Sequence, residues 1–294
     1  MLDVVPLRYG TAFKKAFSDP LTFHALVKAA LGIDFYPTRV QQEYSYPQSV
    51  ARVHVAYDLF AEDEAHRTIV ELQHIRDDAS YDRFLYYHCI GLAEQIVSSE
   101  RYTLDRDVYT LVLLTRWPQE ERLQYGRAVC DFDPVTEEGT KLGVYRHRLV
   151  FVNVKAPPER LPPELRPLLA LMEDTLDGQV DESQYPDDIS RRILEQIRRT
   201  QLSPEENAQL KDEATWEEAQ REAKRDAYRS GIDEGKKLGI DEGKRLLQQA
   251  ILDLCEAYGV PVTEARKQAL QRLDGPDLDA LRATLKAHRS WPER

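Results

Sequence analysis

Cysteine is scarce in this sequence, and its few positions are widely spaced. The 294 residues contain three cysteines, which are Cys89, Cys130 and Cys255. This spacing excludes a CxxC redox motif and the paired ligands of a structural zinc site, and three thiols cannot build a disulfide framework. We therefore expect reduced, buried thiols, as in cytoplasmic proteins.

Long apolar runs and an excess of positive charge are also absent. No segment approaches the ~18 apolar residues needed to cross a bilayer, and the first ten residues lack the pattern of a secretory signal. We expect no membrane contact and a cytoplasmic location. Acidic residues outnumber basic ones by 51 to 40, a net charge of −11. This balance argues against a general nucleic-acid coat protein, although a local basic groove or a bound metal could still offset phosphate charge.

The N-terminal half has the composition of a mixed α/β domain. Hydrophobic residues make up 42% of the chain, enough for a real core. Period-two and β-branched segments predict strands at 52–60, 68–74, 108–115 and 148–154, with a polar connector at 61–66. Helical spacing occurs at 12–31, interrupted by Asp19-Pro20, and at 80–97. Residues 1–156 are therefore expected to form an α/β (α+β) core, a mixed sheet flanked by helices.

The C-terminal half is predicted to be entirely helical. Residues 157–203 read as a helical extension of the core, and 250–294 as a small helical module of their own. Between them, 204–249 is a charged helical linker with Gly-x-x-x-Gly repeats at Gly231, Gly235, Gly239 and Gly243. The glycine stripe indicates either close helix packing in a homodimer formed through 204–258 or an exposed linker.

The residues that suggest chemistry lie in the hairpin formed by the first two predicted strands. Glu71 and Gln73 share one strand face with Ile69 because side chains alternate. A turn centred near Asp63-Glu64 would place Asp58 opposite Ile69, and so ~7–8 Å diagonally from Glu71.

Two carboxylates and an amide oxygen form an incomplete oxygen cage of the type that holds Mg²⁺ or Mn²⁺. Such a metal polarises a phosphodiester and acidifies a bound water. The alternative is that these acids are ordinary solvent-exposed residues on one face of a hairpin.

At these residues the sequence resembles a known superfamily. Asp58-Leu-Phe, Ile69-Val-Glu71-Leu-Gln73 and the Tyr81-Asp-Arg83 helix resemble the PD-(D/E)XK nucleases, in particular the Rpn family of recombination-promoting nucleases, or YhgA-like transposases. The resemblance covers about residues 7–155 and implies a restriction-endonuclease-like fold. The segment Phe13-Lys14-x-x-Phe17 is similar to the opening helix of that family, but Gly10 stands where members usually carry an aspartate.

The resemblance implies a role for each matching residue. Asp58 and Glu71 would hold the metal, and Gln73 would stand where the superfamily usually has lysine. Arg83 would place a positive charge near the phosphate, or else pair with an acid such as Asp82 or Asp78. Lys14 and Lys15 would contribute to a DNA-facing basic edge, or else form an ordinary charged helix face.

Two classes of function follow from these observations. The first is a Mg²⁺-dependent DNA endonuclease linked to recombination or mobile elements. The second is a catalytically inactive binding or assembly protein that keeps the nuclease fold and oligomerises through its helical tail. The intact set of Asp58, Glu71 and Gln73 favours the first class, whereas the net charge and Gly10 favour the second.

Overall fold

The protein divides into two compact units, Met1–Ala214 and Thr215–Arg294. The computed structural model describes residues 1–45, 56–73, 81–96, 103–116 and 121–292. Within this part of the chain, no helix is both long and apolar enough to cross a membrane.

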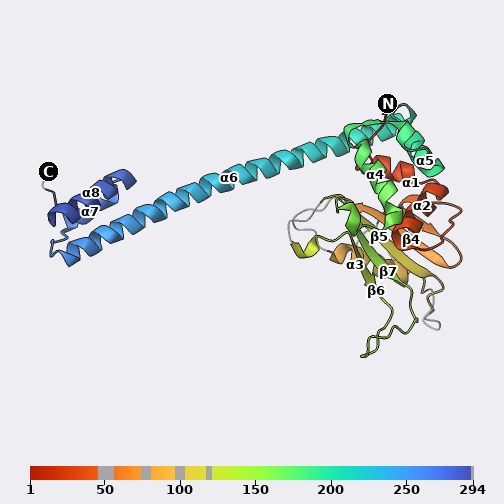
Figure 1. Ribbon diagram of the computed structural model, residues 1–294, viewed down its shortest axis with the longest axis horizontal. Helices are drawn as coiled ribbons and strands as arrows, with labels where there is room; N and C mark the ends of the chain where they lie inside the picture. The colour runs from red at the N-terminus through yellow and green to blue at the C-terminus, as the bar shows by residue number, and fades with distance from the viewer. Residues whose placement is uncertain (46–55, 74–80, 97–102, 117–120, 293–294) are drawn as a thin grey trace. The chain divides into compact units, whose positions relative to one another are not determined.

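The first unit is built on a six-stranded mixed sheet, which confirms the predicted fold class (Figure 1). The strand order is β2 (Gln41–Ser45), β3 (Ala56–Glu62), β4 (His66–Gln73), β5 (Asp107–Leu114), β7 (Arg148–Asn153) and β6 (Arg127–Asp131). Strands β4, β5 and β7 run parallel, whereas β2 and β3 at one edge and β6 at the other pair antiparallel. A separate two-stranded sheet joins β1 (Leu2–Asp3) to β8 (Gln179–Val180).

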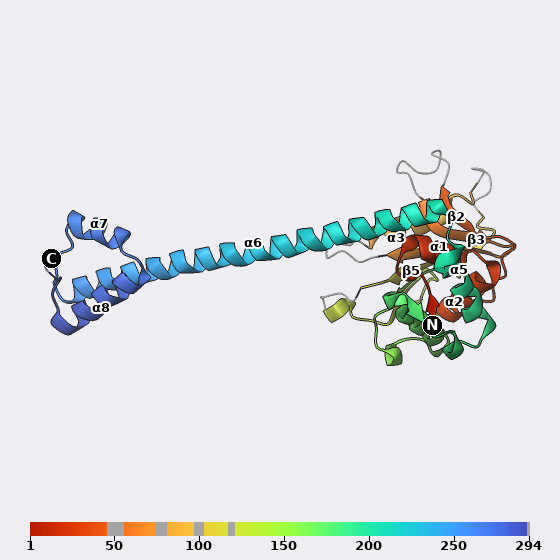
Figure 2. The ribbon, with the colours of Figure 1, turned by 90° about the horizontal axis from the view of Figure 1, so that it is seen from above.

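Helices cover both faces of the large sheet. One face packs against α1 (Gly10–Phe17), α2 (Pro20–Leu31), α4 (Arg166–Asp174) and α5 (Asp188–Ile197), which share its main core (Figure 2). The other face packs against α3 (Asp82–Ala93) through two smaller clusters. Because its central strands are buried on both faces, β5 is almost continuously apolar.

The break predicted at Asp19-Pro20 separates α1 from α2. Asp19 is the N-cap of α2, where its side chain accepts hydrogen bonds from the backbone N–H groups of Leu21 and Thr22 at 2.9 and 3.2 Å. Pro20 follows at the first helical position, where its missing N–H costs no intrahelical bond. Gly32 ends α2 with a left-handed φ of 72°.

The hairpin between β3 and β4 has a different register from the predicted one. Leu59 pairs with Val70 and Phe60 with Ile69. The turn lies later than expected because the Asp63 carboxylate accepts the N–H groups of Ala65 and His66, at 2.8 and 2.6 Å. This side-chain turn shortens the connector, so the expected polar loop at 61–66 was too long.

The second unit contains a small core of its own. It consists of the C-terminal part of α6 (Pro204–Ala257) together with α7 (Glu264–Arg272) and α8 (Gly275–His288). Ile251, Leu270, Leu278 and Leu285 are buried together there. Thr263 and Asp274 cap α7 and α8 through hydrogen bonds from backbone N–H groups three residues on.

The cysteines do not all lie where the sequence suggested. All three are free thiols, but Cys89 and Cys130 are exposed and only Cys255 is buried. The expectation of three buried thiols was therefore wrong. Cys89 is on the outer face of α3, and Cys130 is on the edge strand β6.

Candidate active site

Four predicted site residues meet where β3, β4 and α3 come together. Continuing the register of β3 and β4 by one residue places Asp58 directly opposite Glu71. The expected placement of Asp58 opposite Ile69 was therefore wrong, because Phe60 occupies that position. Gln73 follows Glu71 on the same strand face, and Arg83 reaches both side chains from the first turn of α3.

Each carboxylate is held by the backbone of the opposite strand. The Asp58 N–H donates to Glu71 Oε1 at 3.1 Å, and the Leu72 N–H donates to Asp58 Oδ2 at 2.9 Å. This exchange uses one oxygen of each group. The remaining oxygens, Asp58 Oδ1 and Glu71 Oε2, accept no hydrogen bond from the described residues, and Glu71 Oε2 lies 3.9 Å from Arg83 Nη2.

Burial dominates the electrostatics of this pair. The Glu71 side chain is only 3% exposed, and burial, reinforced by the charge of Asp58, raises its pKa well above the ordinary value. Burial also raises the pKa of Asp58, which is only partly countered by the hydrogen bond from Leu72. The positive charges of Arg83 and Lys14 act in the opposite direction on the pKa of both carboxyls. These positive charges therefore do not offset the effect of burial on the pKa of either carboxyl.

Arg83 is oriented by a residue one turn along α3. Its Nε donates to the Tyr87 hydroxyl at 3.0 Å, and its guanidinium lies 5.1 Å from the centre of the Tyr87 ring. The Nη1 group donates to Gln73 Oε1 at 3.4 Å. The side chain is still 52% exposed. Arg83 thus presents a positioned but accessible cation beside the carboxyl pair.

The two lysines predicted to face DNA lie in different surroundings. Lys14 Nζ lies 2.6 Å from Glu43 Oε1 on β2. Lys15 Nζ lies 2.6 Å from Glu206 Oε2 and donates to the Gln201 carbonyl at 2.7 Å. Lys15 is therefore directed to the start of α6, away from the carboxyl pair, and only Lys14 is on the site side.

Gly10, where the resemblance would place an aspartate, begins α1. The N–H groups of Gly10 and Thr11 donate to the two carboxylate oxygens of Glu213, at 2.7 and 2.9 Å. Glu213 comes from α6, more than 200 residues further along the chain. An acidic group therefore does cap this helix, but it is supplied by a distant segment.

The donor set at the carboxyl pair suits a hard divalent cation. Mg²⁺ and Mn²⁺ prefer oxygen ligands, and Mg²⁺ commonly takes only one or two carboxylates together with waters and substrate phosphate. Asp58 Oδ1 and Glu71 Oε2 are such oxygens, and negative charge is in excess around them. Among the described residues no cluster of three or more His, Cys, Asp or Glu side chains forms a metal cage, so such a cation would keep an open coordination sphere.

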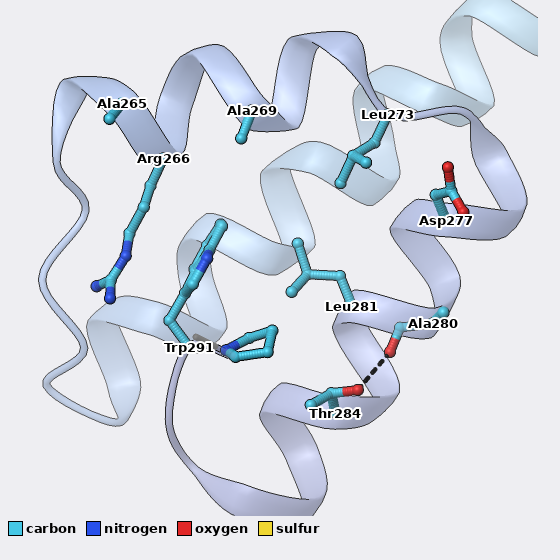
Figure 3. A pocket seen from close by; sticks show the side chains of 10 residues that line it. Ala265, Arg266, Ala269, Leu273, Asp277, Ala280, Leu281, Thr284 and Trp291 are labelled. Atoms are coloured by element: carbon cyan, nitrogen blue, oxygen red, sulfur yellow. Dashed lines mark hydrogen bonds between the residues drawn. The ribbon is translucent and has the colours of Figure 1, made fainter. Parts of the chain in front are cut away.

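A pocket in the second unit has a different chemistry. It has a volume of about 460 Å³ and is lined by apolar residues such as Ala269 of α7, Leu273 just after α7 and Leu281 of α8, with Trp291 beside Arg266 (Figure 3). Of the described residues that line it, Asp277 alone is acidic. This pocket contains none of the predicted site residues and offers no second carboxylate.

Tyr87 belongs to the helix motif that carries the resemblance, and the sequence favours a packing role for it. Its position four residues from Arg83 places it on the same helix face, where it also orients that arginine. Glu43 was not predicted to be near the site, because β2 was not predicted and nothing in its sequence fixes its register against β3.

Comparison of the chain with protein-family models, with curated proteins and with solved structures gives no match in any of the three. The resemblance to PD-(D/E)XK nucleases therefore rests on the motif residues themselves, and the function follows as a proposal from the site.

Proposed function

We propose that this protein is a metal-dependent DNA endonuclease that hydrolyses phosphodiester bonds at the Asp58–Glu71 pair. The observation that carries the proposal is the placement of the buried Glu71 carboxyl beside the half-buried Asp58 carboxyl, with one accessible arginine next to them. Each carboxyl keeps one oxygen that accepts no hydrogen bond from the described residues. A structural role accounts poorly for this arrangement, because like charges buried together destabilise a fold.

Each residue has a distinct task in this proposal. Asp58 and Glu71 would hold Mg²⁺ or Mn²⁺, which when bound activates water and polarises the phosphodiester. Gln73 is neutral, so it can orient a water through its amide but adds no charge to the transition state. Arg83 would neutralise the scissile phosphate through its exposed guanidinium.

The proposed partners and setting follow from the same hypothesis. DNA is the substrate, and the resemblance links the reaction to recombination or mobile elements. Three unpaired cysteines suit a reducing cytoplasm. We also propose a homodimer formed through α6, since a dimeric nuclease can cut both strands.

The test is cleavage of supercoiled plasmid by the purified full-length chain, with Mg²⁺ and with EDTA. We expect Mg²⁺-dependent nicking that Glu71→Ala abolishes, because loss of a ligand charge removes the cation. Glu64→Ala is the matched control, since Glu64 is an exposed acid in the turn of the same hairpin. Equal nicking by wild type and Glu71→Ala would sink the proposal. A folded protein that neither binds Mg²⁺ nor nicks would indicate the inactive assembly protein instead.

A further inference from the structure

The two neighbouring lysines of α1 form a natural matched pair. Each makes one ion pair with an N–O distance of 2.6 Å, and their side chains are 16% and 17% exposed. They differ in where they point: Lys15 binds Glu206 of α6, whereas Lys14 binds Glu43 of β2. Lys15 also donates to the Gln201 carbonyl, but the exposure and the ion-pair distance of the two lysines match, so their main difference is location.

Glu43 lies level with the carboxyl pair. Gln42 pairs with Leu59 and Tyr44 with Tyr57, so Glu43 stands opposite Asp58, which itself stands opposite Glu71. Three acidic residues of adjacent strands therefore occupy one level of the sheet. Glu43 has a φ of 50°, a left-handed conformation that is uncommon for residues other than glycine. The Lys14 ammonium is bound to the outermost of these acids.

Lys14 lies within electrostatic range of the inner two acids as well. Its positive charge lowers the pKa of both Asp58 and Glu71. The Lys14 carbonyl accepts a hydrogen bond from Gln42 Nε2 at 3.5 Å, which also joins α1 to β2 beside Glu43. Lys14 and Arg83 thus place two cations beside the carboxyl pair, from two different helices.

We propose that Lys14 binds the scissile phosphate and that Glu43 is its counter-ion in the DNA-free protein. When DNA binds, the ammonium exchanges the Glu43 carboxylate for a non-bridging phosphate oxygen. The exchange is feasible because the Glu43 side chain is 66% exposed and can turn into solvent, whereas Lys14 stays shielded at 16%. This inference rests on the proposed nuclease function.

The charge balance of the site supports this assignment. Glu43, Asp58 and Glu71 carry three formal negative charges, and Lys14 and Arg83 carry two positive ones. The residual negative charge suits a divalent cation. With that cation present the site becomes positive by one charge and suits an anionic phosphodiester. If Lys14 were absent, the loaded site would be neutral and would attract phosphate less strongly.

The decisive experiment compares Lys14→Gln with Lys15→Gln in the full-length protein. Two quantities are measured: binding of MnCl₂ alone by calorimetry, and plasmid nicking under saturating metal. For Lys14→Gln we expect nicking to fall by at least ~10-fold, while Mn²⁺ binds as tightly as in wild type or tighter, because a repelling charge is gone. Lys15→Gln should leave both quantities within about twofold. A role in folding alone would instead lower metal affinity and nicking together.

Two further variants complete the test. Lys14→Arg keeps the charge and should restore most of the nicking. Glu43→Gln frees the ammonium, so we expect a lower KM for DNA with kcat nearly unchanged, and no such effect when Lys14→Gln is already present.

Nicking by Lys14→Gln at the wild-type rate would overturn this assignment and leave the proposed function standing. A wild-type chain that neither binds Mn²⁺ nor nicks would overturn the proposed function itself.

Discussion

At the scale of single residues, the carboxyl pair is electrostatically unfavourable, and the rest of the fold tolerates it. Asp58 and Glu71 are brought together by strand pairing and held by opposite backbones. Their mutual repulsion and burial oppose ionisation. The carboxyl pair therefore lowers the free energy of unfolding, and a bound cation would raise it again. Such losses of stability are common at functional sites.

The unfavourable electrostatics of this pair predict a pH-dependent gain in stability for Glu71→Gln. The pKa of Glu71 is raised in the fold, so above its ordinary value of about 4.5 the folded chain holds this proton more tightly than the unfolded chain. The free energy of unfolding therefore falls as pH rises through that range. Without metal, we expect the Tm of Glu71→Gln to exceed that of wild type by ~2–4 °C at pH 8, and by much less at pH 4.

Thermal melts in EDTA at the two pH values measure this effect. Adding Mg²⁺ should raise the wild-type Tm but not that of the variant. Equal Tm values for both chains at pH 8 would show that the charge of Glu71 is not destabilising.

His88 predicts the opposite pH dependence. It is fully buried, its Nδ1 lies 3.0 Å from Thr110 Oγ1, and its Nε2 has no partner among the described residues. Burial, with a smaller effect of His147, lowers its pKa from 6.5 to about 4. Below pH 6.5 the unfolded chain takes up this proton first, so the free energy of unfolding falls as pH falls toward 4.

The full effect of this group is about 3 kcal/mol. We expect His88→Asn to flatten the slope of unfolding free energy between pH 6.5 and 4, whatever its effect at pH 8. Urea titrations at four pH values give the slope. An unchanged slope would mean that the fold does not lower the pKa of His88.

At the scale of elements, the first turns of α6 belong to the first unit. Glu206 forms a capping box with Ser203, and its Oε2 also binds Lys15. Glu213 caps α1 through the N–H groups of Gly10 and Thr11. Helix α1, which carries Lys14, is therefore fixed at both ends by the segment that follows the core.

Loss of the Glu213 cap should destabilise the first unit. Tyr9, the N-cap residue of α1, makes no side-chain capping bond, so nothing local replaces the lost acceptor. We expect Glu213→Ala to cost about 1 kcal/mol, or ~2–4 °C in Tm. The exposed neighbour Asp212 supplies the control, and Asp212→Ala should melt like wild type.

If Glu213→Ala and Asp212→Ala melt alike, the cap contributes nothing. The same contacts imply that a shortened chain must extend to Ala214, since ending it near Thr200 would remove both Glu206 and Glu213.

At the scale of the whole molecule, α6 exposes a long face of glycines and apolar side chains, within which Glu242 also falls. Gly231, Gly235, Gly239 and Gly243 have open space where a Cβ would stand, and Tyr228, Ile232, Leu238 and Leu246 are exposed. At 100° per residue these eight positions fall within an arc of roughly 140°. We call them the glycine face. Four glycines cost about 4 kcal/mol of helix propensity, which close packing on a second helix could offset.

Charges along the two edges of the glycine face favour a parallel pair of helices. Glu234 and Asp241 lie along one edge, and Arg229 and Lys236 along the other. Two parallel copies bring unlike edges together, whereas two antiparallel copies bring like edges together. The ion pair between Arg245 and Glu242 is internal to each helix.

We expect the full chain to be a dimer and a chain ending at Ala214 to be a monomer, as measured by light scattering at micromolar concentration. Gly235→Lys should abolish the dimer although it favours the helix, because a side chain now blocks the approach. Ser230→Lys, on the opposite face, should leave the dimer intact. A monomeric full-length chain would show that the glycine face is only a solvated linker.

The sequence by itself determined most of the elements and the identity of the candidate site residues. Apolar periodicity located most helices and the buried strands, and the alternation along β4 placed Glu71 and Gln73 on the face that meets Arg83. These features are local, because they depend on spacing along a single segment. The edge strands β2 and β6 escaped prediction, since they are short and partly exposed and lack a clear apolar pattern.

The tertiary structure alone decided which residues meet. The Asx-turn at Asp63 moved the register of β3 and placed Asp58 opposite Glu71. Pairing of β2 brought Glu43 and hence Lys14 to the same level, and Glu213 reached α1 across more than 200 residues. Such contacts join segments far apart in the chain, and their geometry depends on the packing of the whole unit, which no pattern within one segment encodes.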